Sequence, residues 1–402
     1  MHSTHWIKGN KGKNLSGKTI VIGVTGSIAA VRIVELSREL IRNGADVYAV
    51  MSDAATHILH PDALHYATGN PVITEITGGV EHVGFCGIEG NADLLLIAPA
   101  TANTIGKIAY GIDDTPVTTF VTTAIGSHTP VIVVPAMHQS MYDHPAIAEN
   151  LEKLGKYGIN VVGPLIEEGI AKIASNDDIM LAVERGLVGD ALEGKRVLIT
   201  SGATAETIDP IRILTNRASG KTGLELAKEA FRKGADVTVV HRGSFGIEGI
   251  NEIYVESAEQ MQDACMNELK NGYDIFISAA AISDYTLETP SSSKIKSGDE
   301  LYLKLLPTQK LLPKVRSEYP NLLMVGFKAE TDVNSQDLVN LSSSMLESYG
   351  LDLVVANDVA EKGMGTDDNS ICLVEKDSSS CYSGSKYELA TVIIGKITDL
   401  LR

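Results

Sequence analysis

The chain has 402 residues, 44% of them hydrophobic, and its 51 acidic residues outnumber its 34 basic residues to give a formal net charge of −17. This length and apolar content predict a globular protein with two or three domains, each with its own core. The acidic charge argues against nucleic acid and anionic membranes as partners, and no apolar stretch approaches the roughly 20 residues of a membrane helix.

Residues 1–18 are polar and mildly basic, and they predict a flexible tail without a signal-peptide pattern. The spacing of the four cysteines, Cys86, Cys265, Cys372 and Cys381, matches neither a metal site nor a disulfide framework. We therefore expect unpaired thiols and a cytoplasmic protein. Cys86 in particular is expected to be a buried, unreactive thiol.

The first half opens with a predicted strand, turn, helix and strand. Residues 19–25 (TIVIGVT) are typical of a buried strand, and the turn GSIAA at 26–30 leads into a helix expected to end near Arg42. Gly44 suits the end of that helix, and residues 46–51 form the next strand. Because the turn lacks the GxGxxG glycines of dinucleotide-binding loops, it favours a monophosphate such as that of FMN.

Two further strands, at 94–98 and 131–134, each end in a loop rich in polar side chains. The loops PATANT (99–104) and PAMHQSM (135–141) follow the carboxyl ends of these strands, where open α/β sheets bind ligands. The polar side chains of PATANT, those of Thr101, Asn103 and Thr104, suit a flavin phosphate or the edge of the flavin ring, and structural helix caps explain them about as well. The candidate flavin-binding residues are Gly26, Ser27, Ile28, Ser52, Pro99, Ala100, Thr101, Asn103 and Thr104.

His82 differs from the other histidines because it lies shortly before the strand that leads to PATANT. Histidine ionises near neutral pH, which suits a base that removes a proton from a thiol or an alcohol. A surface or capping role is the alternative. Residues 167–178 (EEGIAKIASNDD) are expected to form a flexible lid.

The second half repeats the plan of the first. Residues 197–200 are a predicted strand, a polar loop leads to a helix over 220–233, and residues 237–241 form the next strand. The segments RNGADVYAV and RKGADVTVV stand at matching places in the two halves. The sequence therefore predicts an α/β protein with two doubly wound Rossmann-like domains, a flavodoxin-like N-terminal sheet and a C-terminal nucleotide-binding sheet. One unusually wide sheet is the alternative.

The glycines and acidic residues of 186–194 (GLVGDALEG) suggest a boundary between the domains. We place the first domain at 19–190, after the tail of residues 1–18, and the second at 191–402.

The stretch 199–223 opens the second nucleotide-binding unit. Its polar excursion over 203–217 is long enough to predict a substrate loop. Asn216 and Arg217 lie just before a predicted helix, whose free N–H groups and dipole favour a phosphate. An ordinary strand-to-helix turn is the alternative.

Several long motifs in order carry a family resemblance over nearly the whole chain. GSIAA, His82, ADLLLIAPATANTIGKIAYGIDD and PAMHQSM make the N-terminal half resemble the flavin-dependent phosphopantothenoylcysteine decarboxylases. GATAETIDPIRILTNRASGKTG, AAAISDY, KIK, VGFKAET and AND make the C-terminal half resemble phosphopantothenate–cysteine ligases. Together the halves resemble the fused bifunctional family of coenzyme A biosynthesis.

For the first half, the resemblance implies an FMN-dependent decarboxylase with His82 as the active-site base and His138 and Met141 as substrate contacts. Loss of CO₂ from a cysteinyl carboxylate needs an electron sink, which the family obtains by flavin oxidation of the thiol to a thioaldehyde. The family's flavin sites usually lie between subunits, and the resemblance implies trimeric contacts here and dimeric contacts in the ligase half.

For the second half, the resemblance implies that 4′-phosphopantothenate attacks the α-phosphate of CTP, and that L-cysteine then displaces CMP from the acyl-cytidylate. Asn216 would serve the acyl-nucleotidylate step, and Asp284 would contact the nucleotide and a phosphate-bound Mg²⁺. Either Lys294 or Lys296 could swing over the triphosphate, and solvated loop lysines are the alternative. The implied substrate-binding residues are Ser278, Ala279, Ala280, Asp284, Lys294, Lys296, Thr308, Gln309, Lys310, Leu311 and Phe327.

The chain departs from the family pattern in both halves. His138 stands where the family has Asn, and the lid lacks the family's proton-donating Cys, which leaves water or Lys172 as the donor. In the ligase half, Thr308 and Gln309 replace a Pro-Asp pair, and residues 338–350 lack lysines that help hold the nucleotide. The motifs therefore support the ligase chemistry more strongly than they support CTP, rather than ATP or UTP, as the nucleotide.

Two other functions remain as alternatives. One is a flavin-binding regulatory protein with a degenerate decarboxylase half. The other is an NAD(P)-dependent oxidoreductase in which Asp53 is the acidic partner of the ribose, although neither strand-to-helix turn has the GxGxxG glycines.

Overall fold

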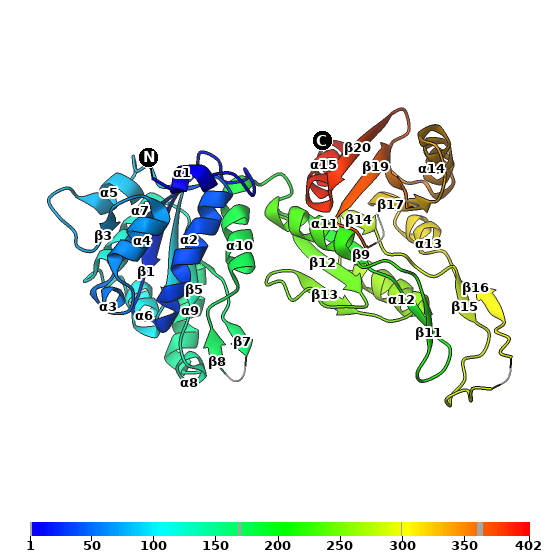
Figure 1. The fold of residues 1–402 in the computed structure, drawn as a ribbon, viewed down its shortest axis with the longest axis horizontal. Coiled ribbons are helices and arrows are strands. Elements are labelled where there is room, and N and C mark those ends of the chain that lie inside the picture. Colours follow the sequence, from blue (N-terminus) through cyan, green and yellow to red (C-terminus); the bar gives the residue numbers. More distant parts are fainter. Residues whose placement is uncertain (1, 168–169, 299, 360–364) are drawn as a thin grey trace. The chain divides into compact units, whose positions relative to one another are not determined.

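The computed structural model describes residues 2–167, 170–298, 300–359 and 365–402. The chain forms two compact units, Met1–Gly189 and Asp190–Arg402 (Figure 1). Both are α/β units built on a mainly parallel sheet, as the sequence predicts. None of the helices that the structure describes is long and apolar enough to cross a bilayer.

The first unit is built on a six-stranded parallel sheet with strand order β3-β2-β1-β4-β5-β6. Because β1 lies in the middle and the chain winds outward on both sides, this is the doubly wound arrangement. The strands are β1 (Thr19–Val24), β2 (Asp46–Met51), β3 (Val72–Ile73), β4 (Leu94–Ala100), β5 (Val131–Pro135) and β6 (Asn160–Val161).

Helices cover both faces of this sheet, because alternate residues of each strand point to opposite sides. Ile20 and Ile22 of β1 belong to a core cluster that includes α2 and α10, whereas Val21 belongs to a second cluster with Phe120 of α7. The helical elements are α1 (Thr4–Ile7), η1 (Ile28–Arg32), α2 (Ile33–Arg42), α3 (Asp53–Thr56), α4 (Pro61–Thr68), α5 (Glu81–Cys86), α6 (Ala102–Tyr110), α7 (Pro116–Ser127), α8 (Gln139–Tyr142), α9 (Pro145–Lys156) and α10 (Asn176–Val188).

The N-terminal segment is part of the first unit, which corrects the prediction of a flexible tail. It contains α1, and its Leu15 side chain is fully buried. The N–H of Gly9 donates to the carbonyl of Ile41 at 3.0 Å, and the N–H of Leu15 donates to that of Asn43 at 2.9 Å. These hydrogen bonds to the end of α2 hold the N-terminal segment in place, and the composition of the segment alone could not reveal them.

The second unit contains an eight-stranded sheet with order β13-β12-β9-β14-β17-β18-β19-β20. The first six strands in this order are parallel and repeat the winding of the first unit, and β19 and β20 are antiparallel at one edge. The strands are β9 (Arg196–Ser201), β12 (Asp236–His241), β13 (Asn251–Tyr254), β14 (Ile275–Ser278), β17 (Leu323–Glu330), β18 (Leu353–Asp358), β19 (Asp368–Val374) and β20 (Ser379–Ser385).

Two core clusters fill the faces of this second sheet, one including α11 and α15 and the other including α12, α13 and α14. Two short antiparallel ladders lie outside the sheet, β10 with β11 and β15 with β16. The remaining elements are β10 (Ala205–Thr207), β11 (Ile213–Thr215), α11 (Lys221–Arg232), α12 (Ala258–Leu269), β15 (Tyr285–Leu287), β16 (Leu305–Pro307), α13 (Leu311–Glu318), α14 (Ser335–Tyr349) and α15 (Lys386–Leu400).

The repeated segment of the two halves has the same local geometry in both units. Gly44 before β2 has φ +106°, and Gly234 before β12 has φ +96°. Residues with a side chain rarely adopt this left-handed conformation, so glycine is needed where the helix turns back into the sheet. Ala45 and Ala235, which follow, are buried.

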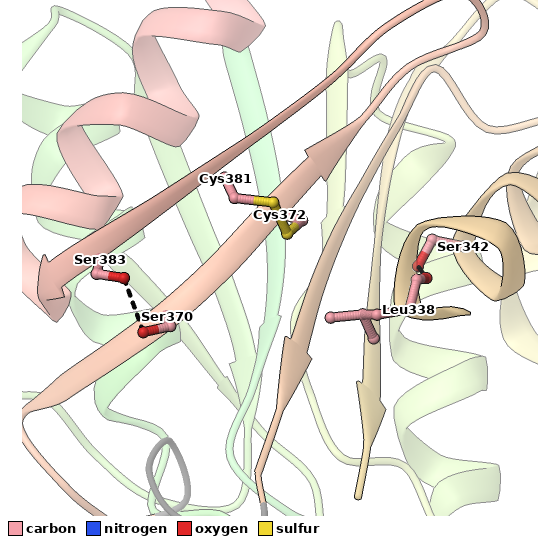
Figure 2. Close-up of a disulfide and its surroundings, with 6 residues drawn as sticks. All are labelled: Leu338, Ser342, Ser370, Cys372, Cys381 and Ser383. Carbon is pink, nitrogen blue, oxygen red and sulfur yellow. Dashed lines mark hydrogen bonds between the residues drawn. A yellow bond between two sulfur atoms is a disulfide. The ribbon is translucent and has the colours of Figure 1, made fainter. Parts of the chain in front are cut away.

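Cys372 and Cys381 form a disulfide, which corrects the prediction that all four cysteines are unpaired. They are register partners on β19 and β20, with Cα atoms 4.0 Å apart. Figure 2 shows the bridge between the two strands, together with the 2.8 Å hydrogen bond between Ser370 and Ser383. Cys86 and Cys265 are free and buried. The prediction of a cytoplasmic location rested on unpaired thiols, and the disulfide removes that support. The location therefore stays a prediction.

Candidate functional site

The carboxyl edge of the first sheet brings two of the predicted flavin loops together. Thr25, which follows β1, is buried and bonds the end of β4 and the residue that precedes α6. Its hydroxyl donates to the carbonyl of Pro99 at 2.6 Å and accepts from the N–H of Thr101 at 3.1 Å. The Gly26 turn and the PATANT loop are therefore held side by side.

The hydroxyl groups proposed to bind the flavin also cap helices. The side chains of Ser27, Ser52 and Thr101 accept hydrogen bonds from the N–H groups of Ala29 at 3.5 Å, Ala55 at 3.3 Å and Thr104 at 3.3 Å, respectively. The capping alternative is therefore correct for Thr101, and Ser27 and Ser52 have the same capping role. A hydroxyl that accepts a hydrogen bond still has its own proton to donate, so capping leaves it able to bind a phosphate oxygen.

The turn between β1 and η1 is packed closely against α3. A Cβ atom added to Gly26 would lie 2.6 Å from the Cβ of Ala54, so a larger residue does not fit. Next to it, Ile28 is 77% exposed. Asn103 is also exposed, whereas Thr104 is buried. The edge thus presents an apolar side chain beside hydroxyl and amide groups, which fits both the ring and the phosphate of FMN.

The loop after β5 lies against the predicted lid. The N–H of Met137 donates to the carbonyl of Ala171 at 3.2 Å, on β8 (Ile170–Lys172), which pairs with β7 (Leu165–Glu167). His138 is exposed and its side chain does not cap α8, and Met141 is 47% exposed. Of the predicted lid, Glu168 and Gly169 lie outside the described residues. The neighbouring carbonyl of Ile173 accepts from Arg32 at 3.3 Å, which ties the end of the hairpin to η1.

His82 lies on α5, where its ring contacts Phe120 of α7 with centroids 6.4 Å apart. Its Nδ1 atom is buried and has no hydrogen-bond partner among the described residues. Within the part of the chain that the structure describes, no ring contact or hydrogen bond joins its side chain to the loops after β1, β2, β4 or β5. On the same helix, burial raises the pKa of Cys86 to about 12, which agrees with an unreactive thiol.

A cavity of about 590 Å³ opens at the carboxyl edge of the second sheet. Ten of the predicted ligase residues line it: Asn216, Ser278, Ala279, Ala280, Asp284, Thr308, Gln309, Lys310, Leu311 and Phe327. Lys294 and Lys296 are exposed and do not belong to the lining. Most of the residues implied by the resemblance therefore line one cavity, whereas the two lysines Lys294 and Lys296 do not.

The loop after β14 is held by β9 and by Asn216. The N–H of Ala280 donates to the hydroxyl of Thr200 at 3.2 Å, and the N–H of Ala281 donates to the carbonyl of Gly202 at 2.8 Å. The side-chain amide of Asn216 donates to the carbonyl of Ala281 at 3.0 Å. Asn216 thus stands at the cavity wall beside the loop that carries Asp284.

A second group of contacts joins the Thr308 loop to Asp284. The N–H of Thr308 donates to the Asp284 carbonyl at 3.0 Å, and Lys310 forms an ion pair with the Asp284 carboxylate. The side-chain amide of Gln262, a buried residue of α12, donates to Gln309 at 3.1 Å. No cluster of three or more His, Cys, Asp or Glu suited to a metal occurs in the described part of the chain. Asp284 would therefore need phosphate oxygens to complete a magnesium site.

The cavity also contains lysines that the sequence analysis did not single out. Lys221, Lys328 and Lys386 line it together with Lys310, and Asp284 is the carboxylate among the lining residues that the structure describes. Lys221 and Lys328 lie within the quoted motifs RASGKTG and VGFKAET, which could have identified them. Lys386 lies 165 residues after Lys221 in a segment without a recognisable motif, so only the fold brings it there.

The loop that carries Lys294 and Lys296 is anchored by Asp209. This buried carboxylate accepts from the N–H groups of Ile211 at 2.8 Å and Ile295 at 3.1 Å. Burial on its own would raise the pKa of Asp209. Hydrogen bonds from these N–H groups, from the N–H of Arg212 and from its guanidinium outweigh burial and lower the pKa to about 2.

Comparisons with known proteins cover both units. Residues 8–187 match the Flavoprotein family model, and residues 192–401 match that of the DNA/pantothenate metabolism flavoprotein C-terminal domain. The coenzyme A biosynthesis bifunctional protein CoaBC of Thermococcus kodakarensis is 49% identical over 405 residues, covering 100% of both chains. That of Methanocaldococcus jannaschii is 38% identical over 408 residues, covering 100% of this chain and 98% of its own. A solved C-terminal domain of a CoaBC protein is 28% identical, with a TM-score of 0.44 over 53% of this chain and 98% of its own.

Proposed function

The chain belongs to the CoaBC family of bifunctional coenzyme A biosynthesis proteins, and we propose on that basis that it joins 4′-phosphopantothenate to L-cysteine and then decarboxylates the product. The ligase reaction belongs to the second unit and the decarboxylase reaction to the first. The observation that carries the proposal is the convergence of Asn216, Asp284 and several lysines in one cavity, in a chain whose relatives match it over its full length. The regulatory alternative is not favoured by these relatives.

In the ligase reaction, the cavity must hold two anionic substrates with the carboxylate aimed at a phosphorus atom. The lysines that line the cavity would neutralise the phosphate charge, and the Asn216 amide would stabilise charge that develops on the acyl group. We assign CTP as the nucleotide, with Thr308, Gln309, Lys310, Leu311 and Phe327 as contacts. Asp284 would hold Mg²⁺ jointly with the phosphates.

In the decarboxylase reaction, FMN supplies the electron sink when bound. The hydroxyls of Ser27, Ser52 and Thr101 would hold its phosphate, and the exposed Ile28 would contact its ring. His82 would take the thiol proton, because its buried Nδ1 is without a partner in the described chain and is free to act. His138 and Met141 would bind the substrate, and water or Lys172 would return the final proton.

We further propose homo-oligomers, with trimeric contacts through the first unit and dimeric contacts through the second. The flavin would then lie between subunits, and His82 of one subunit would act on FMN bound by its neighbour.

The test is to incubate the purified protein with 4′-phosphopantothenate, L-cysteine, Mg²⁺ and CTP, ATP or UTP in turn, and to identify the products by mass. We expect CMP and 4′-phosphopantetheine with CTP, and a yellow protein that binds FMN. A colourless protein that refuses FMN and converts no nucleoside triphosphate to its monophosphate would overturn the proposal.

A further inference from the structure

The loop before α13 carries a glutamine whose backbone and side chain are held by different elements. Gln309 is exposed and lines the cavity of the second unit. The residue before it is fixed, because the Thr308 hydroxyl donates to the carbonyl of Ser283 at 2.6 Å. The Gln309 side chain is held from behind by Gln262 of α12, whose amide nitrogen lies 3.1 Å from Gln309 Oε1.

Gln262 reaches this loop because α12 and the start of α13 share a hydrophobic core. Met261 and Cys265 of α12 belong to the same buried cluster as Leu311 and Leu312 of α13. Gln262 lies on the same helix and is only 8% exposed. Its amide is therefore enclosed by the protein, and the packing of two helices sets its distance from the loop.

The other end of the Gln262 amide is unsatisfied. Its Oε1 atom is buried and has no hydrogen-bond partner in the described part of the chain. A buried acceptor without a partner destabilises a folded protein, and an apolar side chain of similar size would avoid that cost. Stability alone therefore does not explain a glutamine at this position, whereas its contact with Gln309 gives it a role.

The direction of this hydrogen bond decides what Gln309 offers to the cavity. An amide side chain has one oxygen that accepts and one NH2 group that donates twice. Because Gln262 donates to the oxygen of Gln309, the NH2 group of Gln309 is left for the cavity. The family pattern has a Pro-Asp pair in place of Thr308 and Gln309, and an ionised carboxylate can only accept. This chain thus offers a donor at this point of the cavity wall.

We propose that Gln262 is a positioning residue that turns the NH2 group of Gln309 toward the nucleotide, where it donates a hydrogen bond to an uncharged acceptor of the base or the ribose. The assignment rests on the proposed function, in which Gln309 contacts CTP. Gln262 is not among the described residues that line the cavity, so it acts through the orientation of Gln309.

Two substitutions of Gln262 test the direction of the contact. Gln262→Met removes the hydrogen bond and the orphaned oxygen together, and its flexible side chain fills a similar volume. We expect it to raise KM for CTP by roughly 2- to 10-fold, as for one lost hydrogen bond, with kcat within about 2-fold of wild type and a melting temperature that is no lower. Gln262→Glu offers only acceptors, so the Gln309 amide must turn its oxygen to the cavity, and KM for CTP should rise further.

The pair and a neighbouring glutamine supply the controls. Gln309→Ala should raise KM for CTP as Gln262→Met does, and the double variant should be no worse than either, because the two side chains act as one unit. The matched control is Gln260→Met on the same helix. Its side chain accepts from the N–H of Glu256 at 2.8 Å and lies outside the cavity lining that the structure describes, so KM for CTP should equal that of wild type.

The positioning role predicts a loss of nucleotide binding without a loss of stability. A lower melting temperature of Gln262→Met with an unchanged KM for CTP would show a structural role and overturn the proposal. Additive effects in the double variant, or a rise confined to KM for 4′-phosphopantothenate, would also overturn it.

Calorimetry with CTP and Mg²⁺, without the acid substrate, separates this role from the proposed function. CTP binding that weakens in Gln262→Met, in a protein that forms no CMP from the complete mixture, would contradict the proposed function alone. CMP formation with the same KM for CTP in every variant would contradict the positioning role alone. A wild-type protein that binds no CTP would overturn both.

Discussion

At the scale of single residues, the orphaned Nδ1 of His82 is the feature that most directly bears on chemistry. A positioned base contributes roughly 100- to 10,000-fold to a proton-transfer step, so we expect His82→Asn to lower decarboxylation by at least 100-fold. The measurement is CO₂ release from 4′-phosphopantothenoylcysteine. Formation of CMP by the same preparation is the control and should be unchanged, because His82 belongs to the other unit. A variant that decarboxylates normally would remove His82 from the mechanism.

Asp209 is a second residue whose surroundings predict a measurable effect. Its pKa of about 2 in the folded chain lies below the value of about 3.9 expected for an unfolded Asp, so its charge stabilises the folded state. That contribution is complete above about pH 4 and is lost as the pH falls from there toward 2. Asp209→Asn should therefore be less stable than wild type at pH 7, with a difference that shrinks below pH 4. Denaturant unfolding at several pH values measures it, and a pH-independent difference would contradict the assignment.

At the scale of elements, the β19–β20 hairpin is held by a covalent bond between directly opposite residues. A disulfide that spans a sequence separation of 9 stabilises the folded chain by about 2–3 kcal/mol on the loop-entropy estimate. We expect Cys381→Ser to lower the melting temperature and to make it insensitive to dithiothreitol, which should lower that of wild type. Thiol titration of the denatured, unreduced wild type should find two reactive cysteines. Four would show that the bridge is absent.

The turn between α11 and β12 is a second element with a sharp prediction. Gly234 has a positive φ, and an added Cβ would lie 3.1 Å from the N atom of Glu193, so Gly234→Ala should destabilise the chain by about 1 kcal/mol or more. Gly155→Ala in α9 is the matched control, because its Cβ meets nothing within 4 Å and alanine favours a helix. Thermal unfolding should move in opposite directions for the two variants.

At the scale of the whole molecule, the sequence predicted the features that depend on local pattern. The alternation of apolar residues, the repeated GAD segments and the polar loops after strands led to two doubly wound sheets and to a cavity at the edge of the second. The disulfide could not be predicted in this way, because pairing of Cys372 with Cys381 depends on the register of two strands. The order of the N-terminal segment depends on hydrogen bonds to α2, and the place of Lys386 depends on the packing of α15 beside α11. Each of these is a long-range contact that leaves no periodic signal.

The distribution of charge also belongs to the whole molecule. A chain with a net charge of −17 repels anionic ligands at a distance, yet the described residues that line the cavity of the second unit include four lysines and a single carboxylate, Asp284. The positive electrostatic potential of the cavity lysines must therefore overcome the negative potential of the protein surface, and salt weakens both potentials.

Each of the four core clusters draws its members from one unit only. A protease that cuts the connection between α10 and β9 would consequently break no cluster, and neither fragment would be left with half of a hydrophobic interior. The two units are thus joined covalently without sharing a hydrophobic core. Separate expression of the two units would remove the covalent link but would leave each unit with its own core.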